Sequence, residues 1–182
     1  GPDGEYLPDR LTSEAIGFIE HNKDKPFYIY LPHYAVHTPI MGKKEVIAKY
    51  QAKPANGGHS NPVYAALVES VDDSVGRLRA KLEELKLTQD TLFVFTSDNG
   101  GLSGTVNSQG WRRGPTDNSP SRWGTAGSFD GGVLIPLIVS WPKRIAAHGD
   151  VRNRFVHVID LYPTILEAAH VKRPDVYSGR KL

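Results

Sequence analysis

Residues 91–101, Thr-Leu-Phe-Val-Phe-Thr-Ser-Asp-Asn-Gly-Gly, constrain the fold of this chain more than any other stretch. The apolar run over residues 92–95 is rich in β-favouring residues and is typical of a strand buried on both faces, as in a parallel sheet covered by helices. The run is followed by Asp98 and Asn99, and in open α/β sheets ligands bind beyond the carboxyl ends of the strands. Carboxylate and amide oxygens are ligands for calcium or magnesium, although Asp-Asn-Gly-Gly is equally typical of a turn.

Two further apolar runs predict strands, over residues 26–31 and 136–141. The first leads into a segment that contains His33 and His37, and the prolines that flank this pair argue against a helix. Each histidine taken alone is more often a loop residue bonded to the backbone than a ligand. The function of the pair therefore depends on what else lies near this strand end.

The clearest helix is predicted over residues 62–85, where apolar side chains recur at steps of three and four after an Asn-Pro start. Asp72 and Asp73 are interpreted as its solvated flank. The long segment 102–132 lacks periodicity and contains tryptophans and arginines, which suits a loop that binds sulfate, phosphate or carboxylate. The other expected elements are helices over 12–22, 44–53 and 159–169, a short strand or extended lead-in over 155–158, and an extended tail over 171–182.

The composition narrows the class of protein. The 182 residues are enough for one domain with a substantial core, and no internal boundary divides residues 1–182. A net charge of +2 without a basic run does not imply a nucleic-acid partner, and no apolar segment approaches the ~20 residues of a membrane span. The absence of cysteine excludes disulfides, thiolate metal sites and a cysteine nucleophile within the chain. The order of elements predicts an α/β fold with a mixed, mainly parallel sheet between helices.

Five segments, by their order and spacing, resemble the sulfatase family, a branch of the alkaline phosphatase superfamily; they are residues 25–39, 71–76, 91–101, 128–136 and 160–164. The resemblance covers the second half of the family's catalytic domain and implies an incomplete sheet with helices on both faces. The family's earlier segment supplies two metal aspartates and a Cys-x-Pro-x-Arg motif, whose cysteine (serine in some bacterial members) becomes the formylglycine nucleophile. Residues 118–122, Asn-Ser-Pro-Ser-Arg, imitate that motif, but an asparagine cannot be converted to formylglycine.

The resemblance implies roles for individual residues. Asp98 and Asn99 match calcium ligands of the family, where magnesium occasionally replaces calcium. His37 matches a histidine that contacts the sulfate ester and helps to protonate the leaving oxygen, and His33 is expected to support it from behind. The family's sulfate-binding lysine is replaced by Thr125.

Two further departures concern positive charge. Leu134 stands where many members have arginine, so the positive charge that binds the substrate is expected from Arg122, with Arg112 and Arg113 as alternatives. Losing a cation that faces a developing anion typically costs a few kcal/mol of transition-state stabilisation.

The resemblance therefore predicts part of a sulfate-ester hydrolase for a sulfated small molecule or sugar, inactive alone because the formylglycine segment is absent. A phosphatase or phosphodiesterase of the same superfamily and a non-catalytic, glycan-binding sulfatase-like domain are the alternatives. An unpaired sheet edge predicts self-association or pairing with the missing N-terminal half. The family resemblance also implies a periplasmic or secreted location, with neither membrane nor nucleic acid as partner.

Overall fold

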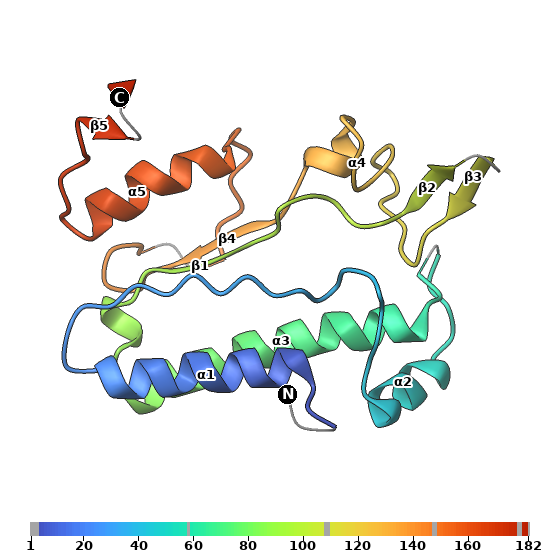
Figure 1. The fold of residues 1–182 in the computed structure, drawn as a ribbon, viewed down its shortest axis with the longest axis horizontal. Coiled ribbons are helices and arrows are strands. Elements are labelled where there is room, and N and C mark those ends of the chain that lie inside the picture. Colours follow the sequence, from blue (N-terminus) through green and yellow to red (C-terminus); the bar gives the residue numbers. More distant parts are fainter. Residues whose placement is uncertain (1–3, 58, 108–109, 147–148, 178–179, 182) are drawn as a thin grey trace.

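The computed structural model describes residues 4–57, 59–107, 110–146, 149–177 and 180–181, and the side chains of residues 105–113 and 176–181 lie outside this description. Two long helices, α1 (Leu7–Asn22) and α3 (Pro62–Glu84), pack side by side beneath the extended segments (Figure 1). The short helix α2 (Lys44–Gln51) packs against α3.

The helix starts follow from local chemistry. The Asn61 side chain accepts hydrogen bonds from the backbone N–H groups of Val63 and Tyr64, both at 3.0 Å, so the predicted cap of α3 is confirmed. The predicted start of α1 near residue 12 is wrong, because the helix already begins at Leu7. Thr12 therefore lies inside the helix and is buried at its α3 face, where only 1% of its surface is exposed.

The strand pair β1 (Phe93–Thr96) and β4 (Leu137–Ser140) confirms two of the three predicted strands, but the pairing is antiparallel, with Phe93 opposite Ser140. All three ladders among the described residues are antiparallel, so the mainly parallel sheet is not present there. Residues 26–31 are extended and run in the same direction as β1, as a parallel sheet requires (Figure 1). No hydrogen bond joins these two backbones in the described part of the chain, so residues 26–31 form no strand pair.

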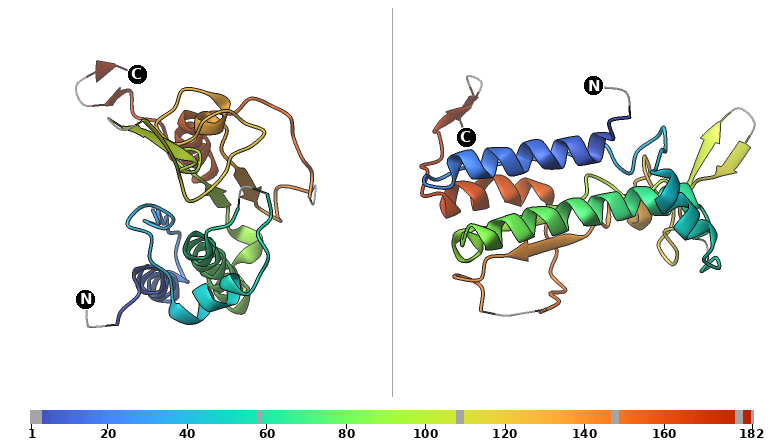
Figure 2. Two further views of the ribbon diagram at one scale, coloured as in Figure 1. Left: turned by 90° about the vertical axis from the view of Figure 1, so that its right-hand side faces the viewer. Right: turned by 90° about the horizontal axis from the view of Figure 1, so that it is seen from below.

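The hairpin of β2 and β3 and the helix α4 lie toward one end of the strand pair, and α5 lies on the side of the strands away from α1 and α3 (Figures 1 and 2). The predicted loop 102–132 contains a hairpin and a short helix that its composition did not indicate, and residues 155–158 form no strand. The tail, expected to be only extended, forms a small antiparallel ladder. The bounds are β2 (Gly104–Asn107), β3 (Gly110–Arg113), α4 (Asp130–Val133), α5 (Leu161–Ala168), β5 (Val176–Tyr177), β6 (Arg180–Lys181), and the 3-10 turns η1 (Thr88–Asp90) and η2 (Val158–Asp160).

The core lies between α1, α3 and the underside of the extended segments. Four side chains at its centre are buried, and alternate residues of segment 26–31 pack onto them with Phe93; the buried four are Ala15, Ile19, Leu78 and Leu82. The other alternate residues, Tyr28 and Tyr30, are 63% and 76% exposed. Segment 26–31 is therefore buried on one face only. The burial on both faces expected for residues 92–95 is not reached either, because all four residues of β1 are half-buried.

No described helix packs against the opposite face of β1 and β4, although α5 lies on that side of the strands (Figure 1). All four residues of β4 are exposed, and α5 contacts no element other than η2 among the described residues. A helix with this many apolar residues normally packs against a sheet or another helix. None of the described helices is long and apolar enough to cross a membrane.

Candidate functional site

The predicted site residues follow two segments that end at the same side of the molecule. Residues 26–31 lead into His33 and His37, and β1 leads into Asp98 and Asn99; both chains run toward the end at which β2 and β3 lie (Figure 1). No hydrogen bond or ion pair links the histidine segment to Asp98 or Asn99 in the described structure. The fold thus brings the two groups to one end without joining them.

His37 is held by its own turn. Its backbone N–H donates to the Tyr34 carbonyl at 2.8 Å, and its ring Nδ1 lies 2.8 Å from the Thr38 carbonyl. A carbonyl oxygen can only accept, so the Nδ1 atom must carry a proton. The exposed ring therefore presents Nε2, which accepts a proton when the ring is neutral and donates one when it is charged.

His33 belongs to a chain of hydrogen bonds that ties the strand end to both long helices. Its Nε2 lies 2.9 Å from the Ser74 hydroxyl, which lies 2.7 Å from the Thr12 hydroxyl, which lies 2.6 Å from the Pro8 carbonyl. The Pro8 carbonyl only accepts, so Thr12 must donate to it, and Ser74 must then donate to Thr12. His33 consequently donates through Nε2–H, which fixes its tautomer.

This tautomer leaves Nδ1 of His33 as a bare acceptor. The atom is buried and has no hydrogen-bond partner among the described residues. Burial also lowers the pKa of His33 below the usual 6.5, because the charged ring is poorly solvated there. His33 is thus a neutral anchor for the segment that carries His37, which is compatible with the supporting role expected for it.

Asp98 and Asn99 form the turn after β1. Asp98 Oδ1 accepts a hydrogen bond at 3.0 Å from the Asn99 backbone N–H, and Ser97 Oγ donates at 2.9 Å to the Asn99 carbonyl. The Asp98 carboxylate is exposed, whereas Asn99 is half-buried. Both the turn and the ligand interpretation of this motif remain compatible with that geometry.

Thr125 lies directly against the predicted metal ligand. Its hydroxyl shares its single proton between Asn99 Oδ1 and the Gly100 carbonyl, the latter at 2.5 Å. Its backbone N–H donates to the Gly101 carbonyl at 3.1 Å. Thr125 therefore contributes a neutral hydroxyl here and orients the Asn99 amide.

Glycines allow this close approach. A Cβ on Gly100 would lie 1.8 Å from the Gly131 carbonyl oxygen, and one on Gly124 would lie 2.3 Å from the Gly101 carbonyl oxygen. The backbone around Gly100, Gly101, Gly124 and Gly131 is called the glycine frame below. Asn118, which sequence reasoning missed as a structural residue, donates its amide N–H groups to three carbonyls in or beside this frame. They are the carbonyls of Gly101, Trp123 and Gly131, at 2.8–3.2 Å. Its position among Ser and Pro in a long loop gave no signal of that role.

Arg122 lies on the outside of the same frame. Its guanidinium stacks 3.3 Å from the centroid of the Phe129 ring, and its backbone N–H donates to Asp130 Oδ1 at 2.7 Å. The side chain is exposed, and no acidic residue pairs with it in the described part of the chain. Of the three arginines considered as substitutes for the lysine, Arg112 and Arg113 lie among the side chains outside the description.

The described donors fit calcium in kind but are too few to complete a shell. Asp98, Asn99, Thr125 and the Gly100 carbonyl are all oxygen ligands, whereas calcium takes about six to eight. No group of three or more His, Cys, Asp or Glu side chains able to hold a metal occurs among the described residues.

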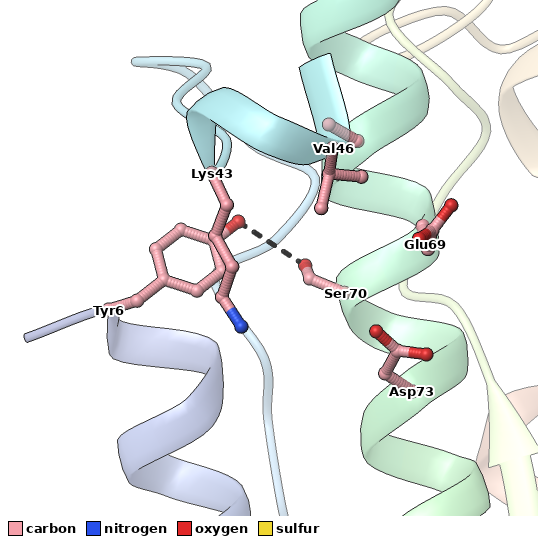
Figure 3. A pocket seen from close by; sticks show the side chains of 7 residues that line it. Tyr6, Lys43, Val46, Glu69, Ser70 and Asp73 are labelled. Atoms are coloured by element: carbon pink, nitrogen blue, oxygen red, sulfur yellow. Dashed lines mark hydrogen bonds between the residues drawn. The ribbon is translucent and has the colours of Figure 1, made fainter. Parts of the chain in front are cut away.

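Two hollows are candidate binding sites. The one between α1, α2 and α3 has a volume of about 10 Å³, room for about one water molecule, and is closed by Tyr6, Lys43 and Ser70 (Figure 3). The other is an open depression of about 410 Å³ beside the glycine frame, lined by Ser103, Thr116, Asp117, Asn118, Ser119, Ser121 and Trp123. Only the second is large enough for an organic ligand.

Comparison with known proteins identifies the family. The family model described as Sulfatase matches residues 1–171. A sulfatase of Formosa agariphila is 35% identical over 181 residues, covering 93% of this chain and 31% of that protein. The steryl-sulfatase of Homo sapiens is 35% identical over 180 residues, covering 98% and 29%.

Solved structures agree in fold. Ps i-CgsB, crystallised with k-i-k-neocarrahexaose, superimposes with a TM-score of 0.78 at 33% identity, over 94% of this chain and 36% of that chain. PsFucS1 sulfatase from Pseudoalteromonas sp. gives 0.71 at 31% identity, over 90% and 30%. The chain thus spans about a third of the length of these relatives, and its α/β arrangement is a part of the alkaline phosphatase-like fold. On these matches, and with the spacing of its strand-end motifs, the chain belongs to the sulfatase family.

Proposed function

We propose that this chain carries the leaving-group side and part of the cation shell of a sulfate-ester hydrolase. The observation that carries the proposal is the arrangement of His37, whose Nδ1–H is held by the Thr38 carbonyl while Nε2 remains exposed. When the ester S–O bond breaks, a proton on Nε2 passes to the departing alcohol oxygen and the ring becomes neutral. Attack on sulfur requires a nucleophile that these 182 residues do not include.

His33 keeps His37 in place without taking the proton itself. The hydrogen bonds through Ser74 and Thr12 tie His33 to α3 and α1. They hold one end of the segment that carries the exposed His37 ring. Burial keeps His33 neutral, which leaves His37 as the proton donor of the pair.

The anionic sulfate would be bound by Arg122 and by a cation. Asp98 and Asn99 would hold calcium together with ligands from outside this chain, and a bound cation would supply polarisation of the sulfate oxygens. Arg122 offers a planar, exposed guanidinium, which matches the oxygens of a sulfate. We take the substrate class to be a sulfated sugar, because a structural relative at 33% identity was crystallised with a neocarrahexaose.

The first test measures hydrolysis of 4-nitrophenyl sulfate by the chain alone with added calcium, with 4-nitrophenyl phosphate alongside. We expect no turnover of either ester. The second test places residues 1–171 into the Formosa agariphila sulfatase in place of its matching segment. We expect this chimera to hydrolyse the sulfate ester, and His37→Ala to reduce kcat by roughly 10²-fold or more.

Each outcome decides a different point. Turnover by the chain alone that disappears in the His37→Ala variant would refute the missing nucleophile. A folded chimera that is inactive, or one in which His37→Ala leaves kcat unchanged, would refute the proposed role. Preference for the phosphate ester would favour the phosphatase alternative.

The contact between Thr125 and Asn99 favours one alternative specifically, a domain that binds sulfated glycans without cleaving them. Thr125 contributes no charge where the family has lysine. Its hydroxyl donates a hydrogen bond to the Asn99 amide oxygen, the atom that would bind the cation. Thr125→Lys in the chimera separates the two functions. A gain in kcat would indicate a weakened enzyme, whereas glycan binding without turnover in both forms would indicate a binding domain.

A further inference from the structure

The open depression beside the glycine frame has the chemistry of a carbohydrate site. Its volume of about 410 Å³ lies in the range of small-molecule sites. Its described lining consists of hydroxyls, one amide and one carboxylate around a single indole, that of Trp123. Sugar rings offer the matching surface, since hydroxyl groups at their rim donate and accept while their C–H faces stack on aromatic rings.

Internal hydrogen bonds determine which polar groups remain for a ligand. The Asn118 amide nitrogen is used by three carbonyls, so its Oδ1 is the atom left to accept from a ligand. Ser103 donates its hydroxyl proton to the Trp123 carbonyl at 3.0 Å and keeps its lone pairs. The Ser121 hydroxyl makes no hydrogen bond to another described residue, although Ser121 is half-buried.

The wall of the depression is closely packed and adjoins the candidate site. The indole of Trp123 is 38% exposed and lies so close to Gly127 that a Cβ there would be 1.9 Å from the ring. The Gly101 carbonyl accepts from Asn118 on the depression side and from Thr125 on the Asn99 side, at 2.8 and 3.1 Å. A ligand in the depression is thus separated from Asn99 by one stretch of backbone.

We propose that this depression is a subsite for one sugar ring of an oligosaccharide, with Trp123 as the stacking platform and Ser121 and Asn118 as hydrogen-bonding partners of the ring hydroxyls. The proposal rests on the sulfated-sugar function proposed above and adds where a second ring of the substrate binds. The neighbouring ring would then carry its sulfate toward Thr125 and Arg122.

Binding without turnover tests the subsite. The 182-residue chain is titrated with neocarrahexaose and with the same hexasaccharide after chemical removal of its sulfate groups, by calorimetry and by the NMR signals of the indole N–H groups. We expect both sugars to bind and to shift the Trp123 signal while that of Trp141 stays in place. The neutral sugar distinguishes recognition of ring hydroxyls from simple attraction of sulfate to arginine.

Three variants complete the test. We expect Trp123→Ala to weaken binding roughly tenfold or more, because a bound sugar would cover this aromatic ring and lose its stacking contact in the variant. Ser121→Ala removes a hydroxyl that makes no hydrogen bond to another described residue, and it should weaken binding about two- to tenfold without affecting folding. Ser128→Ala changes an exposed serine outside the depression and should leave binding unchanged.

The proposal is overturned if neither sugar binds, or if the Trp123 and Ser121 variants bind as tightly as the wild type. It is also overturned if only the sulfated sugar binds and does so independently of Ser121. Failure of the chimera to hydrolyse sulfate esters would refute the hydrolase function and leave the subsite standing. An active chimera whose chain binds neither hexasaccharide would refute the subsite alone.

Discussion

Replacing Ser74 by alanine should destabilise the fold through a single buried N–H group. The substitution removes the hydroxyl between His33 and Thr12, both within hydrogen-bond distance of it. Thr12 keeps its bond to the Pro8 carbonyl, but Nε2–H of His33 loses its partner in an environment from which Ser74, 2% exposed, excludes water. A buried donor left unpaired costs about 1–3 kcal/mol, which we expect as the loss in the free energy of unfolding.

Ser70→Ala, one turn earlier on α3, is the matched control. The Ser70 hydroxyl donates at 2.7 Å to the carbonyl of Leu67 in its own helix and accepts from the Tyr6 hydroxyl at 3.4 Å. Tyr6 can still donate to the Met41 carbonyl at 3.2 Å, so the loss of the Ser70 hydroxyl leaves no buried donor unpaired. We expect a change within about 0.5 kcal/mol. Urea unfolding followed by circular dichroism measures both variants, and a thermal midpoint should fall by about 2–4 °C for each kcal/mol lost. Equal destabilisation by Ser74→Ala and Ser70→Ala would refute the assigned hydrogen-bond chain.

Three further predictions follow from the same geometry. Because the pKa of His33 is lowered below 6.5 in the folded state, the unfolded chain takes up its proton first. The free energy of unfolding should therefore fall as the pH drops below about 6.5. His33→Gln should make this dependence on pH less steep, as measured by urea titrations at several pH values. Gly100→Ala should prevent native folding, because a Cβ would lie 1.8 Å from a backbone oxygen. Gly17→Ala has open space in α1 and should raise the free energy of unfolding by about 0.5–1 kcal/mol. Urea denaturation of the two variants tests both expectations. Ile138→Lys on the exposed β4 should increase the monomeric fraction in sedimentation experiments, and a wild-type chain that is already monomeric would contradict the expected self-association.

Local signals predicted the elements whose chemistry is local. The Asn61 cap and the α3 stripe needed only near neighbours in sequence, and both are present in the structure. Pairing of residues 26–31 failed because a strand needs neighbours on its edges, and the described chain provides none. The apolar recurrence over residues 62–85 includes Val68, which is nevertheless 48% exposed. Ser74 is buried instead, because its hydrogen bonds to Thr12 and His33 decide that position rather than apolar periodicity.

The same contrast applies to the candidate site. The motifs led to Asp98, Asn99 and His37 as candidates because strand ends and residue types are visible in the sequence. They could not indicate that Thr125 donates to the Asn99 side chain, since the two residues are 26 positions apart and are brought together by glycines that tolerate backbone contact.

Thr125 provides no positive charge, and its only hydroxyl proton is already used within the site. A lysine there would add a positive charge beside Asn99 and could donate to sulfate, whereas the threonine hydroxyl spends its proton on the amide and the Gly100 carbonyl. The Arg122 guanidinium stacks on the Phe129 ring. Its charge is exposed to solvent there and is therefore screened. Under the proposed function, we therefore expect sulfate binding to depend more on a cation at Asp98 and Asn99 than it would with a lysine at position 125. Measured on the chimera, the calcium dependence of sulfate-ester hydrolysis should accordingly weaken when Thr125→Lys restores the charge.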